Sequence, residues 1–367
     1  MTADPALCLL DLPRMRGLEI GPLARPRVKK ADGQISYVDH CSTEELRRAY
    51  SANSLMRPHL DEIVEVDYVI KDGSTLSEAI GTDGPFDYLI ASHVLEHLAN
   101  PIGWLQDVAK VLTAGGLVSL VIPDKRYCFD VNRAETRPQD WVDWYLRDLR
   151  APSYGQLFDF FAHVTTIDGM VDTAALWAGT IDYDGVRRPD VPDADIAAYA
   201  SCLHYRETGA YMDVHAGVYT PGSLLALIEL GIKLELLDLE VAFFAPTRRD
   251  SLEFHITLRG CAPSARPEAL ASVAAARGQL ATADVPAVPS ATPPGPVVTP
   301  PTPELTEPAP DVSEEAPGSA EPEAGAPPSL GPRQPGASML EVSAKERALI
   351  SFKRSAMWQL RGLLRKL

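Results

Sequence analysis

Four titratable residues are candidates for taking a proton from a substrate: Asp124, His163, Asp213 and His215. The run Asp213-Val214-His215 is the most informative of them, because an extended chain places alternate side chains on one face. A carboxylate beside an imidazole orients the ring of a general base. A buried polar position without a catalytic role is the simpler interpretation of His163, and both interpretations stay open for His215.

Other polar residues follow predicted strands. An apolar strand that starts near Met15 ends in Glu19-Ile20-Gly21, and a second strand, Ile35-Ser36-Tyr37-Val38, ends on Asp39. A glycine after the first strand lets the backbone approach a ligand, and an acidic residue about 20 positions later accepts hydrogen bonds from ribose hydroxyls. The pair therefore predicts a nucleotide-type ligand at this end of the strands.

Strands and helices alternate along the first third of the chain. The β-branched run from Glu62 to Ile70 predicts a third strand that carries Asp67, and the apolar runs from Phe86 to Ala91 and from Leu117 to Ile122 predict a fourth and a fifth. This alternation predicts a Rossmann-like α/β fold, in which a parallel sheet is covered on both faces and binds ligands at the carboxyl ends of its strands. The residues expected at that edge are Gly21 and the polar residues Asp39, Asp67, Ser92, His93 and Asp124.

The alternation stops between about residues 131 and 215. Helical spacing in Trp141 to Leu149 and in Gln156 to His163 predicts an inserted, helical substrate cap. Thr220-Pro221 then starts another helix, and two strands follow at Leu234 to Phe244 and Leu252 to Leu258. The connection between these strands is too short for a crossover helix, so we expect them to be antiparallel.

The string His93-Val94-Leu95-Glu96-His97 matches an inverted zinc-protease motif, His-x-x-Glu-His. Two imidazoles four residues apart on a helix can share a zinc ion, but this string follows a buried strand. We therefore predict no metal ligand here. The five scattered cysteines lack Cys-x-x-Cys spacing, so they predict neither a disulfide framework nor a thiolate zinc site.

Composition divides the 367 residues into three parts. Residues 1–261 are predicted to fold as one domain, whereas residues 262–340 are rich in proline, alanine and glutamate, which predicts a disordered linker. Residues 341–367 predict a basic amphipathic helix. A net charge of −16 argues against a nucleic-acid partner. The opening residues lack a signal-peptide pattern and no apolar run reaches the roughly 20 residues of a membrane span, so we expect a cytoplasmic protein.

Together these residues resemble the class I S-adenosylmethionine-dependent methyltransferases, whose Rossmann-like fold has a seven-stranded mixed sheet with the last strand antiparallel. The similarity covers about residues 15 to 260 and is nearest to bacterial enzymes of polysaccharide and glycan biosynthesis. The landmarks are Leu18-Glu19-Ile20-Gly21-Pro22, Val38-Asp39, Phe86-Asp87-Tyr88 leading to Ser92-His93-Val94-Leu95-Glu96-His97, and Gly115-Gly116.

The resemblance implies S-adenosylmethionine as the cofactor. Glu19 and Gly21 would line its methionine end, and Asp39 would hold its ribose. Asp67 would lie by the adenine, whereas Ser92 and His93 would lie under the sulfonium and the methyl acceptor.

By the same resemblance we expect an enzyme that O-methylates a sugar or glycan precursor, with His215 and Asp213, or His163 or Asp124, taking the hydroxyl proton. One alternative is a catalytically silent methyltransferase-like scaffold in a glycan-assembly complex. Another is a methyltransferase that acts on a small metabolite, a lipid or a protein. Residues 341–367 are expected to contact an anionic membrane surface, peripherally at its inner face, or a glycosyltransferase complex.

Overall fold

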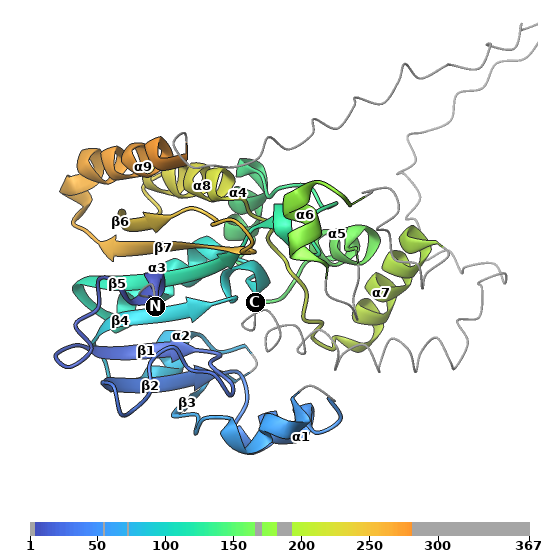
Figure 1. The fold of residues 1–367 in the computed structure, drawn as a ribbon, viewed down its shortest axis with the longest axis horizontal. Helices are drawn as coiled ribbons and strands as arrows, with labels where there is room; N and C mark the ends of the chain where they lie inside the picture. The colour runs from blue at the N-terminus through green and yellow to red at the C-terminus, as the bar shows by residue number, and fades with distance from the viewer. Residues whose placement is uncertain (1–3, 54–55, 72, 166–170, 182–192, 281–367) are drawn as a thin grey trace, which may run out of the picture. The chain divides into compact units, whose positions relative to one another are not determined.

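The computed structural model describes residues 4–53, 56–71, 73–165, 171–181 and 193–280. Within these residues seven strands form one sheet in the order β3-β2-β1-β4-β5-β7-β6 (Figure 1). The strands are β1 (Arg16–Ile20), β2 (Gln34–Asp39), β3 (Tyr68–Val69), β4 (Phe86–Ser92), β5 (Leu112–Pro123), β6 (Leu239–Ala245) and β7 (Glu253–Gly260). The α-helices are α1 (Thr43–Tyr50), α2 (Leu76–Ile80), α3 (Pro101–Val111), α4 (Pro138–Leu146), α5 (Tyr154–His163), α6 (Thr173–Ala178), α7 (Ala194–Thr208), α8 (Pro221–Lys233) and α9 (Arg266–Leu280).

The sheet is mixed. Strands β1 to β5 pair in parallel, whereas β7 is antiparallel to both of its neighbours, β5 and β6. This confirms the predicted Rossmann-like sheet and the predicted antiparallel pairing of the last two strands. Ile20 of β1 lies beside Val38 of β2 and Ala91 of β4. The residues that follow them, Gly21, Asp39 and Ser92, therefore share one edge of the sheet.

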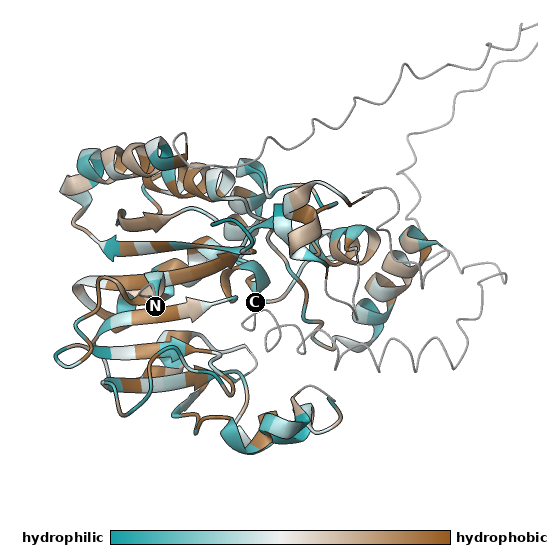
Figure 2. Ribbon diagram, in the orientation of Figure 1, coloured by the Kyte–Doolittle hydropathy of each residue, from teal (hydrophilic) through white to brown (hydrophobic). Residues whose placement is uncertain are grey.

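The central strand β4 is buried on both faces because its sequence is almost continuously apolar. On one face, Leu89 and Ala91 share an apolar cluster with residues of α2, α3, α8 and α9. On the other face, Tyr88 and Ile90 pack with Val28 and with apolar residues of the segment 7–15. Figure 2 shows the apolar strands in brown at the centre of the fold. The two faces are thus covered as predicted, one by helices and the other partly by this N-terminal segment.

Gly17 in β1 leaves no room for a side chain. A Cβ atom there would lie 2.0 Å from the ring of Tyr88, which is fully buried in the neighbouring strand β4. We expect Gly17→Ala to lower the free energy of unfolding by roughly 1–3 kcal/mol, because overpacking shifts the ring or the strand. Urea unfolding measures the change.

The matched control for this substitution is Gly278→Ala in α9, where a new Cβ meets no atom within 4 Å. We expect this variant to be more stable than the wild type by up to about 1 kcal/mol, since alanine favours a helix. Wild-type stability in Gly17→Ala would contradict the close contact between β1 and β4.

Strand β3 is shorter than the predicted strand from Glu62 to Ile70, since only Tyr68–Val69 pairs with β2. The residues before it form other hydrogen bonds. The N–H of Val64 donates to the carbonyl of Leu23, and the N–H of Val66 donates to the hydroxyl of Thr43. Asp67 therefore precedes β3 instead of lying within the predicted strand. Strand β6 likewise starts at Leu239 rather than at the predicted Leu234.

The folded region extends past the predicted domain end at residue 261. Helix α9 packs on α8 and β6 and buries Ala269, Val273 and Ala276. The prediction of a linker without a packed core is wrong for residues 262–280, because the proline content averaged to residue 340 hides an alanine-rich segment with high helix propensity. The rest of that predicted linker and the predicted helix 341–367 lie outside the described residues.

The predicted insertion, residues 131–215, contains the helices α4 to α7. Its helices α5 and α7 share a separate apolar cluster with Phe129, Met212 and Val214. In Figure 1, α5 and α6 lie beyond the ends of the strands, on the side where the sheet was predicted to bind ligands. Among the described residues, no helix is both long and apolar enough to span a bilayer.

Candidate functional site

A pocket of about 630 Å³ lies at the carboxyl edge of the sheet. Gly21 and Asp39 line it from the ends of β1 and β2, and residues 70, 71 and 73–76 line it from the loop after β3. His97 adds to the wall from the turn that follows β4. The insertion supplies Tyr145, Asp148, Leu149, Arg150, Tyr211 and Asp213. The pocket therefore joins the ligand-binding end of the sheet to the insertion.

Asp39 has a carboxylate oxygen that is ready for a ligand. Its side chain is buried. Oδ1 accepts a hydrogen bond from the backbone N–H of His40 at 2.8 Å and lies 2.6 Å from Nδ1 of the His40 ring. Oδ2 is also buried and accepts no hydrogen bond from any described residue. Since a buried acceptor without a donor is unfavourable, this oxygen is suited to a hydroxyl of a bound molecule.

Gly21 and Glu19 shape the loop beside Asp39. Gly21 has a φ of 63°, in the region that favours glycine, and its N–H donates to the carbonyl of Val38 at 2.8 Å. Glu19 is fully buried, and its carboxylate accepts hydrogen bonds from the backbone N–H groups of Arg27 at 2.8 Å and Val28 at 3.2 Å. Gly21 thus lines the pocket, while Glu19 stabilises the loop that follows β1 through hydrogen bonds to the backbone of that loop.

Asp67 does not line the pocket. Its Oδ1 lies 2.8 Å from Nζ of Lys30, and its Oδ2 accepts a hydrogen bond from the backbone N–H of Tyr37. The residues after β3 that line the pocket include Ile70 and Lys71 instead. Strand β3 has only two residues, Tyr68 and Val69, and Asp67 lies before it. This short strand explains the shift.

Ser92 and His93 lie behind the pocket wall, which Val94 reaches instead. The hydroxyl of Ser92 accepts a hydrogen bond from Arg27, and Nε2 of His93 lies 2.8 Å from Oε2 of Glu253 in β7. Burial alone would raise the pKa of Glu253, but the contacts with His93 and Arg27 lower it to about 2. These residues form an ionic network that ties β4 to β7.

The predicted base and its orienting carboxylate have different partners from those expected. His215 Nδ1 lies 2.5 Å from Oδ2 of Asp130, not beside Asp213. Asp213 Oδ1 instead lies 2.8 Å from Nδ1 of His97. The prediction of a direct His215–Asp213 pair is therefore corrected to two pairs. The two rings still meet, with 4.7 Å between the centroids of His97 and His215.

Glu96 lies between these two histidines. Its Oε1 is 3.8 Å from Nε2 of His97, 4.0 Å from Nε2 of His215 and 3.5 Å from Nδ1 of His93. Burial alone would raise the pKa of Glu96, but the contact with His93 and the neighbouring histidines lower it to about 2. Glu96 is therefore ionised at neutral pH although its side chain is buried.

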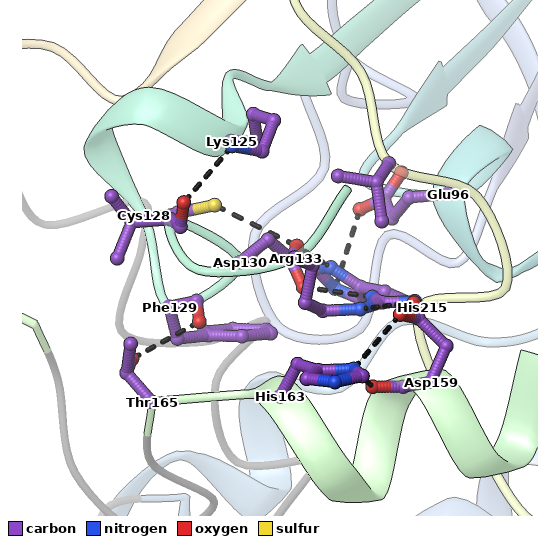
Figure 3. A network of polar contacts seen from close by, with 12 residues as sticks. Glu96, Lys125, Cys128, Phe129, Asp130, Arg133, Asp159, His163, Thr165 and His215 are labelled. Carbon is purple, nitrogen blue, oxygen red and sulfur yellow. Dashed lines mark hydrogen bonds and ion pairs between the residues drawn. The ribbon is translucent and has the colours of Figure 1, made fainter. Parts of the chain in front are cut away.

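A buried arginine supports the His215 side of this cluster (Figure 3). Arg133 lies 2.8 Å from Oδ1 of Asp130 and 2.7 Å from Oδ2 of Asp159, and its guanidinium is 1% exposed. Burial alone would raise the pKa of Asp130, but the charges of His215 and Arg133 hold it well below its usual range. Asp130 is thus a permanent anion that fixes the ring of His215.

The two remaining predicted candidates lie away from the pocket wall. Asp124 is fully buried, and its carboxylate binds Arg126 and accepts a hydrogen bond from the hydroxyl of Thr247. His163 is half exposed and lies 3.0 Å from Oδ1 of Asp159 on the same helix. Asp124 therefore stabilises the turn after β5, and His163 adds to the edge of the Arg133 network.

Three residues of the cluster carry roles that the sequence did not predict: Glu96, His97 and Asp130. Glu96 and His97 belong to the His-x-x-Glu-His string, so a signal for them was present. Asp130 is 85 residues from His215 along the chain, and nothing near it in the sequence marks it as the partner of a histidine.

Part of the chain is similar to a known family of proteins. Residues 13–171 match the model of a family described as a methyltransferase domain. Over these residues, which make up less than half of the chain, the protein is similar to a methyltransferase domain. The matched residues include Gly21, Asp39, Glu96 and His97, while Asp213 and His215 lie beyond them. No curated protein matches the sequence of this chain.

Several solved structures are similar to this chain at low identity. One is an S-adenosylmethionine-dependent methyltransferase from Mesorhizobium loti, with 12% identity, a TM-score of 0.33 and coverage of 68% of this chain and 93% of that one. Another is the CcbJ methyltransferase from Streptomyces caelestis, with 17% identity, a TM-score of 0.25 and coverage of 36% and 56%. A third, named as a Zn-dependent alcohol dehydrogenase from Rhodobacter sphaeroides, has 11% identity, a TM-score of 0.36 and coverage of 70% and 90%. These scores assign no activity to the chain.

The residues of the pocket fit S-adenosylmethionine, the cofactor of this domain. The buried Oδ2 of Asp39 suits a ribose hydroxyl, because it has an acceptor site that no described residue fills. Gly21 lets the backbone approach the bound molecule at the end of β1. The pocket continues to His97 and Asp213, which leaves room for a second molecule next to the cofactor.

Proposed function

We propose that the protein is an S-adenosylmethionine-dependent methyltransferase that transfers a methyl group to a hydroxyl group of a sugar or glycan precursor. The observation that carries the proposal is the His97–Asp213 pair on the wall of the pocket that also contains Gly21 and Asp39. A hydroxyl oxygen attacks a methyl group well only when its proton is removed. An imidazole that is oriented by a carboxylate is suited to assist that removal.

When bound, S-adenosylmethionine would supply an activated methyl group: its carbon–sulfur bond would break, with the electron pair left on sulfur, as the acceptor oxygen bonds to the carbon. The pocket has to hold the acceptor in line with that bond, because a displacement of this kind depends on orientation. Asp39 lies at one part of the wall and His97 at another, so both partners of the reaction have a place.

The side chains on the acceptor side support a sugar as the class of acceptor. Trp104, Tyr145 and Tyr211 contribute aromatic surface to the wall, and a sugar ring can lie against such a surface. Asn100 and Arg150 add polar groups that can bond to hydroxyls. Tyr145, Arg150 and Tyr211 come from the insertion, in agreement with a substrate cap.

Incubation of the full chain with S-adenosylmethionine and a set of sugars and sugar nucleotides tests the proposal. We expect mass spectrometry to detect one added methyl group on a hydroxyl. Asp213→Asn should lower kcat by roughly 100-fold, in the usual range for proton transfer by a positioned group, and leave cofactor affinity nearly unchanged. Transfer to an amine or carbon atom only, or a normal kcat for Asp213→Asn, would overturn the proposal.

The control for this experiment is His59→Ala. His59 and Glu62 form another histidine–carboxylate pair at 3.0 Å, but this pair is partly exposed and does not line the pocket. We expect this variant to keep the wild-type rate.

The place of action is a separate part of the proposal. The chain as a whole has a net charge of −16, whereas residues 341–367 contain seven lysine or arginine residues and two glutamates. We propose a cytoplasmic enzyme that meets an anionic membrane surface through this segment, because opposite charge and the apolar face of the helix predicted from its sequence favour such contact.

A further inference from the structure

Glu96 is the least satisfied charged group in the described part of the chain. Its side chain is 1% exposed, and neither carboxylate oxygen accepts a hydrogen bond from the described residues. A buried carboxylate without hydrogen bonds is costly unless a cation or a donor lies beside it. The nearest groups are three imidazoles, those of His93, His97 and His215.

Two of these rings have a carboxylate at Nδ1. Asp213 lies at Nδ1 of His97, and Asp130 lies at Nδ1 of His215, at 2.8 and 2.5 Å. A carboxylate at Nδ1 holds a proton on that nitrogen, so Nε2 is the ring atom that can bind a metal ion. Both Nε2 atoms are about as close to Glu96 as ion-pair partners, at 3.8 and 4.0 Å.

Three electron-rich groups thus face one another. Single ligand atoms of Glu96, His97 and His215 all lie within 4.8 Å of one another, and all three residues are buried. The carboxylates of Asp213 and Asp130 lie at the outer nitrogens of the two histidines, and Arg133 pairs with Asp130. A divalent cation would give a positive partner to the buried carboxylate of Glu96, whose two oxygens accept no hydrogen bond from the described residues.

We propose that Glu96, His97 and His215 bind a divalent transition-metal ion. Two imidazoles and one carboxylate form a donor set that suits zinc and its neighbours in the first transition row, and three protein ligands leave a position open for a substrate. Asp130 and Asp213 orient the two ligand histidines, as carboxylates do around many metal centres. This proposal revises the sequence prediction of no metal ligand in the His-x-x-Glu-His string.

The inference rests on the proposed function and deepens it by assigning what activates the acceptor. His97 lines the pocket, so an ion bound to it is within reach of the acceptor side. A metal ion lowers the pKa of an oxygen group that it binds. The acceptor hydroxyl then loses its proton to solvent in the pocket, and the same oxygen forms the bond to the methyl carbon. His97 acts through the ion in this scheme rather than as a free base.

Calorimetric titration of the full chain, stripped with a chelator, tests the metal site without cofactor or acceptor. We expect Zn²⁺ or Mn²⁺ to bind the wild type with one equivalent per chain. Glu96→Gln, which keeps the shape of the side chain, and His215→Ala should each weaken binding more than the roughly 10- to 100-fold that loss of a supporting carboxylate causes. His59→Ala is the matched control and should bind the ion like the wild type.

Two results would overturn the metal proposal: no binding of either ion by the folded wild type, or wild-type affinity in folded Glu96→Gln. Circular dichroism of each variant establishes whether it is folded. If His215→Ala does not fold, the affinity of Glu96→Gln alone tests the metal site. Failure here is distinguishable from failure of the proposed function. A chain that transfers a methyl group to a hydroxyl but binds no ion retains the function and refutes only the metal site.

Discussion

Asp39→Ala is expected to weaken the binding of S-adenosylhomocysteine by roughly 10- to 100-fold, the factor that corresponds to the loss of a hydrogen bond to a charged group. Asp39 is buried at the end of β2, and its Oδ2 has no hydrogen-bond donor among the described residues. A ribose hydroxyl supplies that donor when the cofactor product binds. Calorimetric titration of the wild type and the variant measures the difference.

Asp67→Ala is the control for this prediction. Asp67 was predicted from the sequence to lie by the adenine, but in the structure it binds Lys30 and the backbone of Tyr37 and does not line the pocket. We therefore expect its substitution to change the affinity only slightly. An equal loss of affinity in both variants would show that Asp67 belongs to the cofactor site after all. Wild-type affinity in Asp39→Ala would refute the assigned role of Asp39.

Asp130→Ala is expected to lower the free energy of unfolding by about 1–3 kcal/mol, because a buried guanidinium loses one of its two carboxylate partners. The charge is that of Arg133, which is 1% exposed and has Asp159 as its other partner. The substitution also releases the ring of His215 from its hydrogen bond. Urea unfolding followed by circular dichroism gives the free energy.

The matched control is Asp11→Ala, which breaks the exposed pair of Asp11 and Arg14. Exposed pairs contribute little, so we expect a change below about 1 kcal/mol. If Asp130→Ala were no more destabilising than this control, the Asp130–Arg133–His215 network would not support the fold as described.

The sheet that positions the site was predicted well from the sequence, because its strands depend on local patterns. The apolar runs of β1, β2, β4 and β5 alternate with helical spacing, and such alternation allows few arrangements other than a parallel sheet. Residues directly after these strands must share one edge. For this reason Gly21 and Asp39 were found from spacing alone, and both line the pocket.

The pairing of the polar side chains depends on contacts between distant parts of the chain. Asp213 and His215 were predicted to act together because they are two residues apart. In the structure Asp213 meets His97, 116 residues away, and His215 meets Asp130, 85 residues away. The hydrophobic periodicity of the sequence does not predict such contacts, because the fold of the insertion determines them. Asp67 was misplaced for a related reason, because β3 pairs over fewer residues than its β-branched sequence suggests.

A crystal structure of the full chain with S-adenosylhomocysteine tests the central claim most directly. We expect the ribose hydroxyls within hydrogen-bond distance of Asp39, and the sulfur in the part of the pocket that leads to His97 and Asp213. That result would place the cofactor product and the proposed acceptor site in one pocket. A molecule bound away from Asp39, or a pocket left empty at saturating concentration, would contradict the account.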